Sequence, residues 1–258
     1  MTIQYLSDLH LELKDNREYL SKLPLKATGD ILVVAGDSFY LEDEDMRRSS
    51  FWQWASDHYE QVLLVPGNHE YYGGYDIRAN GDSWEWKFLS NVGYYNNKVV
   101  TIGDTDFILS TLWSSISPEN EQAISIFLND FHRATYDGRK FTPDDYNAEH
   151  EKSLSFVRHA VANSKARHRV VVTHHVPTGL CTPKKLRVIR GGSLEEAFTV
   201  DLTDYIFHAP IDYWIYGHSH VNYEAMISGT IVTSNQLGYV FRGENEWNGF
   251  YFGKKIDL

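Results

Sequence analysis

The stretch ILVVAGD, residues 31–37, is a clear indication of the fold that we expect for this chain. Its five apolar residues have the length of a strand, and a glycine and an aspartate follow them. A continuous apolar run of this kind suits a strand that is covered on both faces. Four other apolar runs also end in polar residues that can bind metals: residues 3–6 before Asp8 and His10, 62–65 before Asn68 and His69, 170–173 before His174, and 213–216 before His218 and His220.

Helical patterns lie between these runs. In residues 43–60, apolar side chains recur at the spacing of a single helical stripe. Residues 142–165 begin with Thr142, Pro143 and two aspartates, which together favour a helix N-terminus. Ser193 and Glu196 have the spacing of a capping box, which predicts a further helix.

Short strands are also predicted at residues 107–109, 230–233, 239–241 and 249–252. The alternation of strands with helices indicates an α/β domain with a largely parallel or mixed sheet. The chain has 258 residues and contains no repeat, low-complexity tract or Pro/Gly-rich linker. We therefore expect one domain that spans residues 1–258.

The charge of the chain disfavours extended contact with nucleic acid. Lysine and arginine number 24 against 35 aspartates and glutamates, which gives a formal net charge of −11. Proteins that bind nucleic acid non-specifically usually present a basic face. A local basic cluster remains, and a solvated loop is its simpler interpretation: Lys184, Lys185, Arg187 and Arg190.

Neither a disulfide nor a membrane segment is expected. Cys181 is the single cysteine, so it cannot form an internal disulfide or a multi-thiolate metal site. The N-terminal sequence MTIQYLSDLH lacks the basic region and the apolar run of a signal peptide. No apolar stretch approaches the roughly 18 residues of a membrane helix. The predicted location is the cytoplasm, without contact to a membrane.

The polar residues that follow the strands form a consistent ligand set. The carboxyl ends of strands are where α/β sheets bind ligands, so these residues can converge on one point. Their oxygen and nitrogen donors suit Mn, Fe, Zn, Co or Ni. Seven ligands are too many for one tetrahedral ion, but two ions that share a carboxylate would use them all: Asp8, His10, Asp37, Asn68, His174, His218 and His220.

Each motif alone has a plain structural explanation, because Gly-Asp and Gly-Asn are common turn sequences. That explanation would have to hold independently at five strand ends. The spacing of Asp8-x-His10 and His218-x-His220 also places both members of each pair on the same side of an extended chain. Gly36, Gly67 and Gly217 precede ligand candidates and permit tight turns there.

The order Asp-x-His, Gly-Asp, Gly-Asn-His-Glu, His and Gly-His-x-His, from residue 8 to residue 220, resembles the calcineurin-like metallophosphoesterases. Three other stretches resemble a small bacterial and phage-type subgroup: Thr111-Leu112-Trp113, Asn129-Asp130-Phe131 and residues 235–239. The resemblance implies a four-layer α/β/β/α sandwich with two mixed β-sheets.

The resemblance also implies a role for each site residue. Asp8, His10, Asp37 and His220 would hold one metal ion, and Asp37, Asn68, His174 and His218 the other, with Asp37 shared between them. His69 would help the leaving oxygen to depart, so His69, Asn68 and Asp37 are the expected catalytic residues. Glu70 is a candidate for orienting His69, and His175 for lining the pocket or contacting substrate.

These residues predict a dinuclear hydrolase of small phosphate esters, with phosphodiesters slightly favoured. A hydroxide held between two divalent ions, with manganese expected, would attack phosphorus. The alternatives are a phosphomonoesterase or a nuclease of the same family, and an inactive metal-binding scaffold for protein partners. Aromatic residues at 71–90 and 112–150 could stack a nucleobase, although packing against the domain is favoured for the tryptophans.

Overall fold

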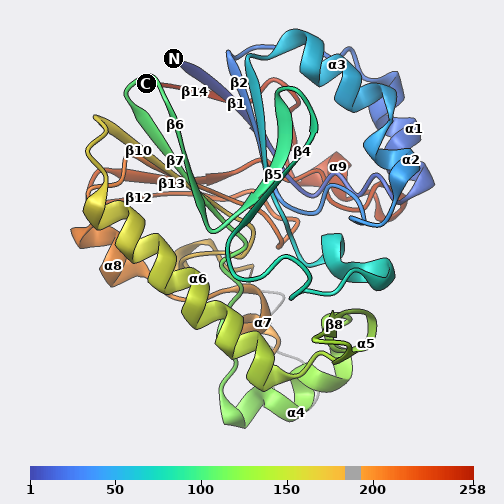
Figure 1. Ribbon diagram of the computed structural model, residues 1–258, viewed down its shortest axis with the longest axis vertical. Coiled ribbons are helices and arrows are strands. Elements are labelled where there is room, and N and C mark those ends of the chain that lie inside the picture. Colours follow the sequence, from blue (N-terminus) through green and yellow to red (C-terminus); the bar gives the residue numbers. More distant parts are fainter. Residues whose placement is uncertain (184–192) are drawn as a thin grey trace.

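The computed structural model describes residues 1–183 and 193–258, and two mixed β-sheets dominate it (Figure 1). The first sheet has the order β14-β1-β2-β3-β5-β4 and the second has the order β12-β13-β11-β10-β7-β6. In each sheet the four central strands are parallel and both edge strands are antiparallel. The strands of the two sheets are β1 Thr2–Leu6, β2 Ile31–Ala35, β3 Gln61–Val65, β4 Trp84–Leu89, β5 Val92–Asn96, β6 Lys98–Ile102, β7 Thr105–Ser110, β10 His168–Thr173, β11 Tyr213–Tyr216, β12 Glu224–Ile227, β13 Thr230–Ser234 and β14 Lys255–Asp257.

Both faces of each sheet are covered, which explains the continuous apolar runs. Alternate residues of the central strands, such as Tyr5, Val33 and Val172, form a buried layer between the two sheets. The intervening residues, such as Val34 in β2 and Val171 in β10, face outward into separate apolar clusters beneath the helices. The two-residue strands β8 Thr135–Tyr136 and β9 Arg139–Lys140 form a small separate pair.

Helices complete the outer layers. Phe51 and Trp52 of α3 pack on the first sheet, and Val157 of α6 and Ile206 of α8 pack on the second, so the α/β/β/α prediction is confirmed. The helices are α1 Lys14–Lys22, α2 Glu44–Arg47, α3 Ser50–His58, α4 Pro118–Phe127, α5 Asp130–Arg133, α6 Pro143–Asn163, α7 Glu195–Phe198, α8 Thr203–His208 and α9 Glu244–Trp247, with 3₁₀ helices η1 His69–Gly74, η2 Gly179–Cys181 and η4 Val240–Arg242.

Local signals placed α6 correctly but failed at two other helical segments. Thr142 and Asp145 form the capping box of α6. Residues 43–60 form two helices, α2 and α3, because the Asp43 side chain caps a short first one by accepting from the backbone of Met46. The helix predicted after Ser193 is present as α7, but the Ser193–Glu196 capping box is wrong: Leu194 is the N-cap, and the Glu196 carboxylate accepts hydrogen bonds from Ser117.

The last segment of the chain also differs from the prediction. Residues 239–241 are not a strand, because η4 begins at Val240 and a left-handed Gly243 ends it. Residues 249–252 form no strand either, since the Asn235 side chain bonds the backbone of Tyr251 in both directions. The edge strand is β14 at Lys255–Asp257. This segment is therefore shaped by side-chain hydrogen bonds that a local apolar pattern does not encode.

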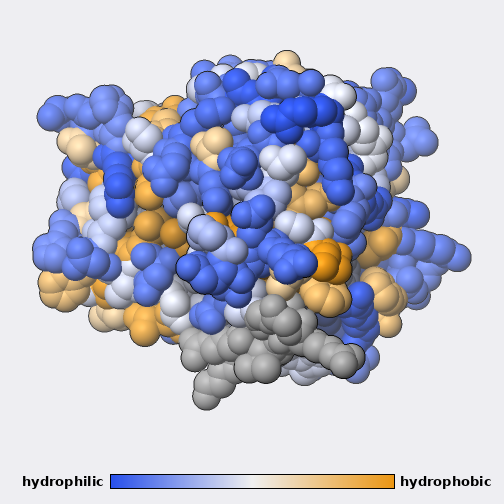
Figure 2. Space-filling model, turned by 90° about the horizontal axis from the view of Figure 1, so that it is seen from below, coloured by the Kyte–Doolittle hydropathy of each residue, from blue (hydrophilic) through white to orange (hydrophobic). Residues whose placement is uncertain are grey.

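Two observations concern membrane-spanning helices and the surface of the molecule. No helix in the described part of the chain is long and apolar enough to cross a membrane. The face seen from below is mostly hydrophilic, and its apolar side chains lie in small groups (Figure 2). The basic cluster of Lys184, Lys185, Arg187 and Arg190 lies outside the described residues.

Candidate metal centre

The seven predicted ligands come together where the parallel strands of both sheets end. Asp8 and His10 follow β1, Asp37 follows β2, and Asn68 follows β3, while the remaining histidines follow β10 and β11 of the second sheet. Hydrogen bonds join these loops across the sheets. The backbone N–H of His218 donates to Asp8 Oδ1 over 3.0 Å, and His174 Nδ1 lies 2.9 Å from the carbonyl oxygen of Ala35.

The backbone of this centre is strained. Five of the seven predicted ligands have left-handed conformations that non-glycine residues rarely adopt: Asp8, His10, Asp37, His218 and His220, with φ between 45° and 75°. Each such residue costs of order 1–3 kcal/mol, and such costs cluster at functional sites. These conformations redirect the chain just past the strand ends, where the side chains converge.

Asp37 lies between two groups of ligands. Asp8, His10, Asp37 and His220 form one group that could hold a metal ion, and Asp37, His174 and His218 form another. Asp37 Oδ2 lies 3.7 Å from His10 Nε2, and Asp37 Oδ1 lies 3.3 Å from His174 Nε2. Asn68 Oδ1 extends the second group, 3.0 Å from His174 Nε2. Asp37 is thus within reach of both groups, and the division of the ligands between two ions stays a prediction.

The donor atoms of the first group fit a cation. His10 Nε2 and His220 Nε2 lie 3.1 Å apart and face each other. The Nδ1 atom of His10 lies 3.0 Å from Glu12, and that of His220 lies 2.6 Å from Glu244. If each Nδ1–H donates to its carboxylate, both Nε2 atoms present lone pairs to the same point. A divalent ion at that point would satisfy both.

The electrostatics also favour positive charge at both groups. Burial lowers the pKa of His220, but its hydrogen bonds to Asp8 and Glu244 outweigh burial and raise that pKa to about 9. Burial likewise lowers the pKa of His174, and the charge of Asp37 raises it to about 9. The carboxylates thus stabilise a positive charge at these two histidines, one in each group, and a bound metal ion would replace the proton there.

Glu12 contacts Nδ1 of His69 and so holds this ring beside the centre. Its Nδ1 lies 2.9 Å from Glu12 Oε1, and its Nε2 lies 3.2 Å from the hydroxyl of Tyr239 and 4.0 Å from Asp37 Oδ2. Burial lowers the pKa of His69, but the charges of Asp37 and Glu12 raise it above its ordinary value. The ring can therefore carry a proton on the nitrogen that faces the cavity.

Glu12 is a functional residue that the sequence analysis missed. One oxygen, Oε1, contacts Nδ1 of both His10 and His69, and the neighbouring histidines lower the pKa of Glu12 to about 2 despite its burial. The alternation Asp8-x-His10-x-Glu12 was the available signal, since it places a third polar side chain on the same side of the chain. Glu12 fixes the orientation of a predicted ligand and of the predicted acid together.

Replacing Glu12 by glutamine is expected to weaken Mn²⁺ binding by about 10–100-fold, the range typical of a residue that orients a ligand. The amide keeps the shape of the carboxylate but loses the charge that holds both Nδ1–H groups. Calorimetric titration with Mn²⁺ measures this change in affinity. Glu18→Gln on the exposed face of α1 is the matched control. Wild-type affinity in Glu12→Gln would show that Glu12 does not orient His10.

Other buried polar groups support the same side chains. The Asp130 carboxylate accepts from Asn68 Nδ2 over 2.8 Å and from the Tyr72 hydroxyl, which leaves Asn68 Oδ1 facing His174. Burial raises the pKa of Asp130. The Asn129-Asp130-Phe131 stretch was noted only for its resemblance, and its physical role is to orient Asn68.

Two expected roles change. Glu70 does not contact the His69 side chain: its buried carboxylate accepts hydrogen bonds from the backbone of Asp37, Ser38 and Gly67, and so joins the loops after β2 and β3. His175 does not line the cavity, since its ring lies between the Tyr146 hydroxyl and the carbonyl oxygen of Thr111. It packs against His218, with ring centroids 4.2 Å apart.

The two glycines of these loops allow the close approach. A Cβ atom on Gly36 would lie 2.3 Å from the ring of His174, and Gly36 has a φ of +86°. A Cβ atom on Gly67 would lie 2.2 Å from Asp37 Oδ1. Any side chain at either position would displace a predicted ligand, so glycine is required for contact rather than only for turning.

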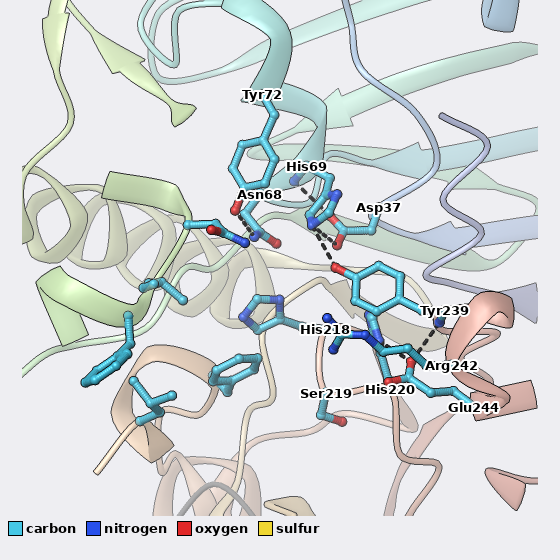
Figure 3. Close-up of a pocket in the computed structure, with 15 residues that line it drawn as sticks. Asp37, Asn68, His69, Tyr72, His218, Ser219, His220, Tyr239, Arg242 and Glu244 are labelled. Atoms are coloured by element: carbon cyan, nitrogen blue, oxygen red, sulfur yellow. Dashed lines mark hydrogen bonds and ion pairs between the residues drawn. The ribbon is translucent and has the colours of Figure 1, made fainter. Parts of the chain in front are cut away.

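A cavity of about 410 Å³ opens over the centre, and Figure 3 shows the residues that line it. Tyr239, Arg242, His220 and Glu244 lie together on one side, and Tyr72 and Asn68 lie on another. Most of the predicted aromatic rim is absent, because Trp84 and Trp113 are buried in a hydrophobic core cluster, in agreement with the packing favoured for the tryptophans. Of the aromatic residues at 71–90 and 112–150, Tyr72 and Phe127 reach the cavity.

This fold and this shared cluster of carboxylates and histidines define a class of hydrolases. A model of the calcineurin-like phosphoesterases matches residues 1–222, and the chain therefore belongs to this family. Uncharacterized protein L509 of Acanthamoeba polyphaga mimivirus is 32% identical over 280 residues, which cover 99% of this chain and 96% of the viral protein.

Solved structures show the same fold at low identity. The phosphopantetheinyl hydrolase of Mycobacterium tuberculosis aligns with a TM-score of 0.64 at 18% identity, over 99% of this chain and 95% of its own. A dimetal phosphatase from Danio rerio aligns with a TM-score of 0.50 at 12% identity, over 91% of this chain and 86% of its own.

Proposed function

We propose that residues 1–258 form a single-domain phosphodiesterase that uses two divalent metal ions, with manganese as the preferred metal. Asp8, His10 and His220 hold one ion, Asn68, His174 and His218 hold the other, and Asp37 contributes to both. The position of Asp37 between the two ligand groups supports this division. Two such ions supply a nucleophilic oxygen at neutral pH and offset the charge of the phosphoryl group.

The protein side chains supply orientation and a proton. His69 carries its proton on the nitrogen that faces the cavity and donates it to the departing oxygen. Glu12 keeps that ring in place through Nδ1, and Asp37 favours its protonated form. Asn68, held by Asp130, directs its carbonyl oxygen to the centre, and its neighbour His69 borders the same cavity.

The preference for diesters rests on the extent of the cavity. It continues past the centre on two sides, one formed by Tyr239 and Arg242 and the other by an apolar wall. The wall consists of Phe127, Leu128, Leu194 and Phe198. Phe198 stacks on His218, with ring centroids 4.5 Å apart, so the wall lies beside the second ligand group. A phosphodiester has two substituents, and each side can accommodate one.

The test is metal analysis combined with hydrolysis of two chromogenic esters. After loading with Mn²⁺, we expect two ions per chain and faster hydrolysis of bis-p-nitrophenyl phosphate than of p-nitrophenyl phosphate. Chelation should abolish both activities, and Mn²⁺ should restore them. Faster monoester hydrolysis would indicate a phosphatase, and two bound ions without either activity would favour a scaffold. A chain that binds no metal would contradict the proposal.

A further inference from the structure

Arg242 is the one arginine or lysine among the described residues that line the cavity. It ends η4, and its guanidinium lies over the ring of Tyr239 at 5.0 Å and over that of Phe241 at 5.3 Å. Across residues 1–183 and 193–258, its side chain forms no hydrogen bond and no ion pair, so the guanidinium donors remain available to a ligand.

Tyr239 links this cation to the metal centre. The Tyr239 ring lies 4.5 Å from that of His220 and 4.6 Å from that of His10, and its hydroxyl contacts His69 Nε2. Arg242 is thus one aromatic ring away from the first ligand group, on the side of the predicted acid. The backbone N–H of Tyr239 donates to Glu244, which also contacts His220, so this side is fixed at several points.

The far side of the cavity is neutral as far as the described residues go. Beside the second ligand group lies the wall of Phe127, Leu128, Leu194 and Phe198, with the uncharged Asn129 next to it. Arg242 lies on the far side of the Tyr239 ring from the first ligand group, away from the proposed position of the scissile phosphate. Its planar set of donors therefore suits a separate carboxylate or phosphate group.

We propose that Arg242 selects substrates that carry a second acidic group, a carboxylate or phosphate, on the substituent next to His69. The position assumed for the scissile phosphate rests on the proposed function. The opposite substituent contacts the apolar wall. Arg242 is a specificity-determining residue, since it binds the substrate without contacting the reacting atoms.

The test compares two small phosphate monoesters that differ in one acidic group, 3-phosphoglycerate and glycerol 3-phosphate. Calorimetric titration of the Mn²⁺-loaded protein is expected to show about 10-fold tighter binding of 3-phosphoglycerate, at the lower end for a charge-assisted pair. In Arg242→Ala this ratio should fall to within about 2-fold, and Arg242→Lys should retain part of it. Arg133→Ala, an exposed arginine stacked on Tyr72, should keep the wild-type ratio.

Three outcomes would overturn the proposal. Arg242→Ala could bind both ligands with wild-type affinity, or it could bind both equally more weakly at an unchanged ratio, which would place Arg242 on the common phosphate. If Arg133→Ala lost the ratio to the same extent, the preference would come from the overall positive charge near the cavity and not from a contact with Arg242. Hydrolysis of bis-p-nitrophenyl phosphate is measured in parallel. A protein that loses its binding ratio in Arg242→Ala but hydrolyses no ester supports the role of Arg242 and rejects the proposed function.

Discussion

Replacing Asp37 by asparagine is expected to reduce kcat/KM for bis-p-nitrophenyl phosphate by about 10³-fold or more, the scale of losing a preorganised electrostatic group. Its two oxygens face His10 and His174, in different ligand groups. An asparagine has one oxygen and no charge, so it can serve only one group. Oδ1 also accepts from the backbone of His69, and that bond would compete for the remaining oxygen.

Metal analysis and steady-state kinetics on the same preparation measure this effect. We expect Asp37→Asn to retain fewer than two ions per chain while keeping the wild-type unfolding temperature of the metal-free protein within a few degrees. Asp204→Asn changes a fully exposed carboxylate in α8 and serves as the control. An Asp37→Asn protein with two ions and wild-type kinetics would show that Asp37 is not the shared ligand.

Replacing His69 by alanine is expected to leave the metal content unchanged and to slow hydrolysis by about 10²–10⁴-fold, the usual contribution of a positioned acid. His69 is not needed for either ligand group, and its Nε2 faces the cavity beside Tyr239. The loss should be largest for alkyl esters, whose leaving oxygens require a proton. It should be small for p-nitrophenyl esters, which depart as stable anions.

The dependence on the leaving group separates a chemical role from a structural one. Rates for a series of aryl and alkyl methyl phosphodiesters, plotted against the pKa of the leaving alcohol, should give a steeper slope in His69→Ala than in the wild type. His208→Ala, on the surface of α8, is the control for histidine removal. Full activity of His69→Ala on an alkyl ester would reject the acid role.

Most of the central strands could be predicted from the sequence, because they are apolar on both faces. ILVVAGD predicted β2 at Ile31–Ala35 with both bounds correct, since the sheet is covered by helices on one side and by the other sheet on the second. The strand predictions failed for residues 239–241 and 249–252, a region where Asn235 and Asn248 bond the backbone through their side chains. Such long-range bonds leave no periodic trace in the sequence.

The amino-acid sequence alone predicted which residues bind metal, because each follows a strand and carries a donor of the right type. The tertiary structure fixes how closely they meet, since the approach of loops from the two sheets places Asp37 3.7 Å from His10 and 3.3 Å from His174. It also decided the roles of Glu12, Asp130 and Arg242. Glu12 and Asp130 meet His69 and Asn68 at separations of 57 and 62 residues, and packing also places Arg242 beside the cavity, so local spacing does not encode these positions.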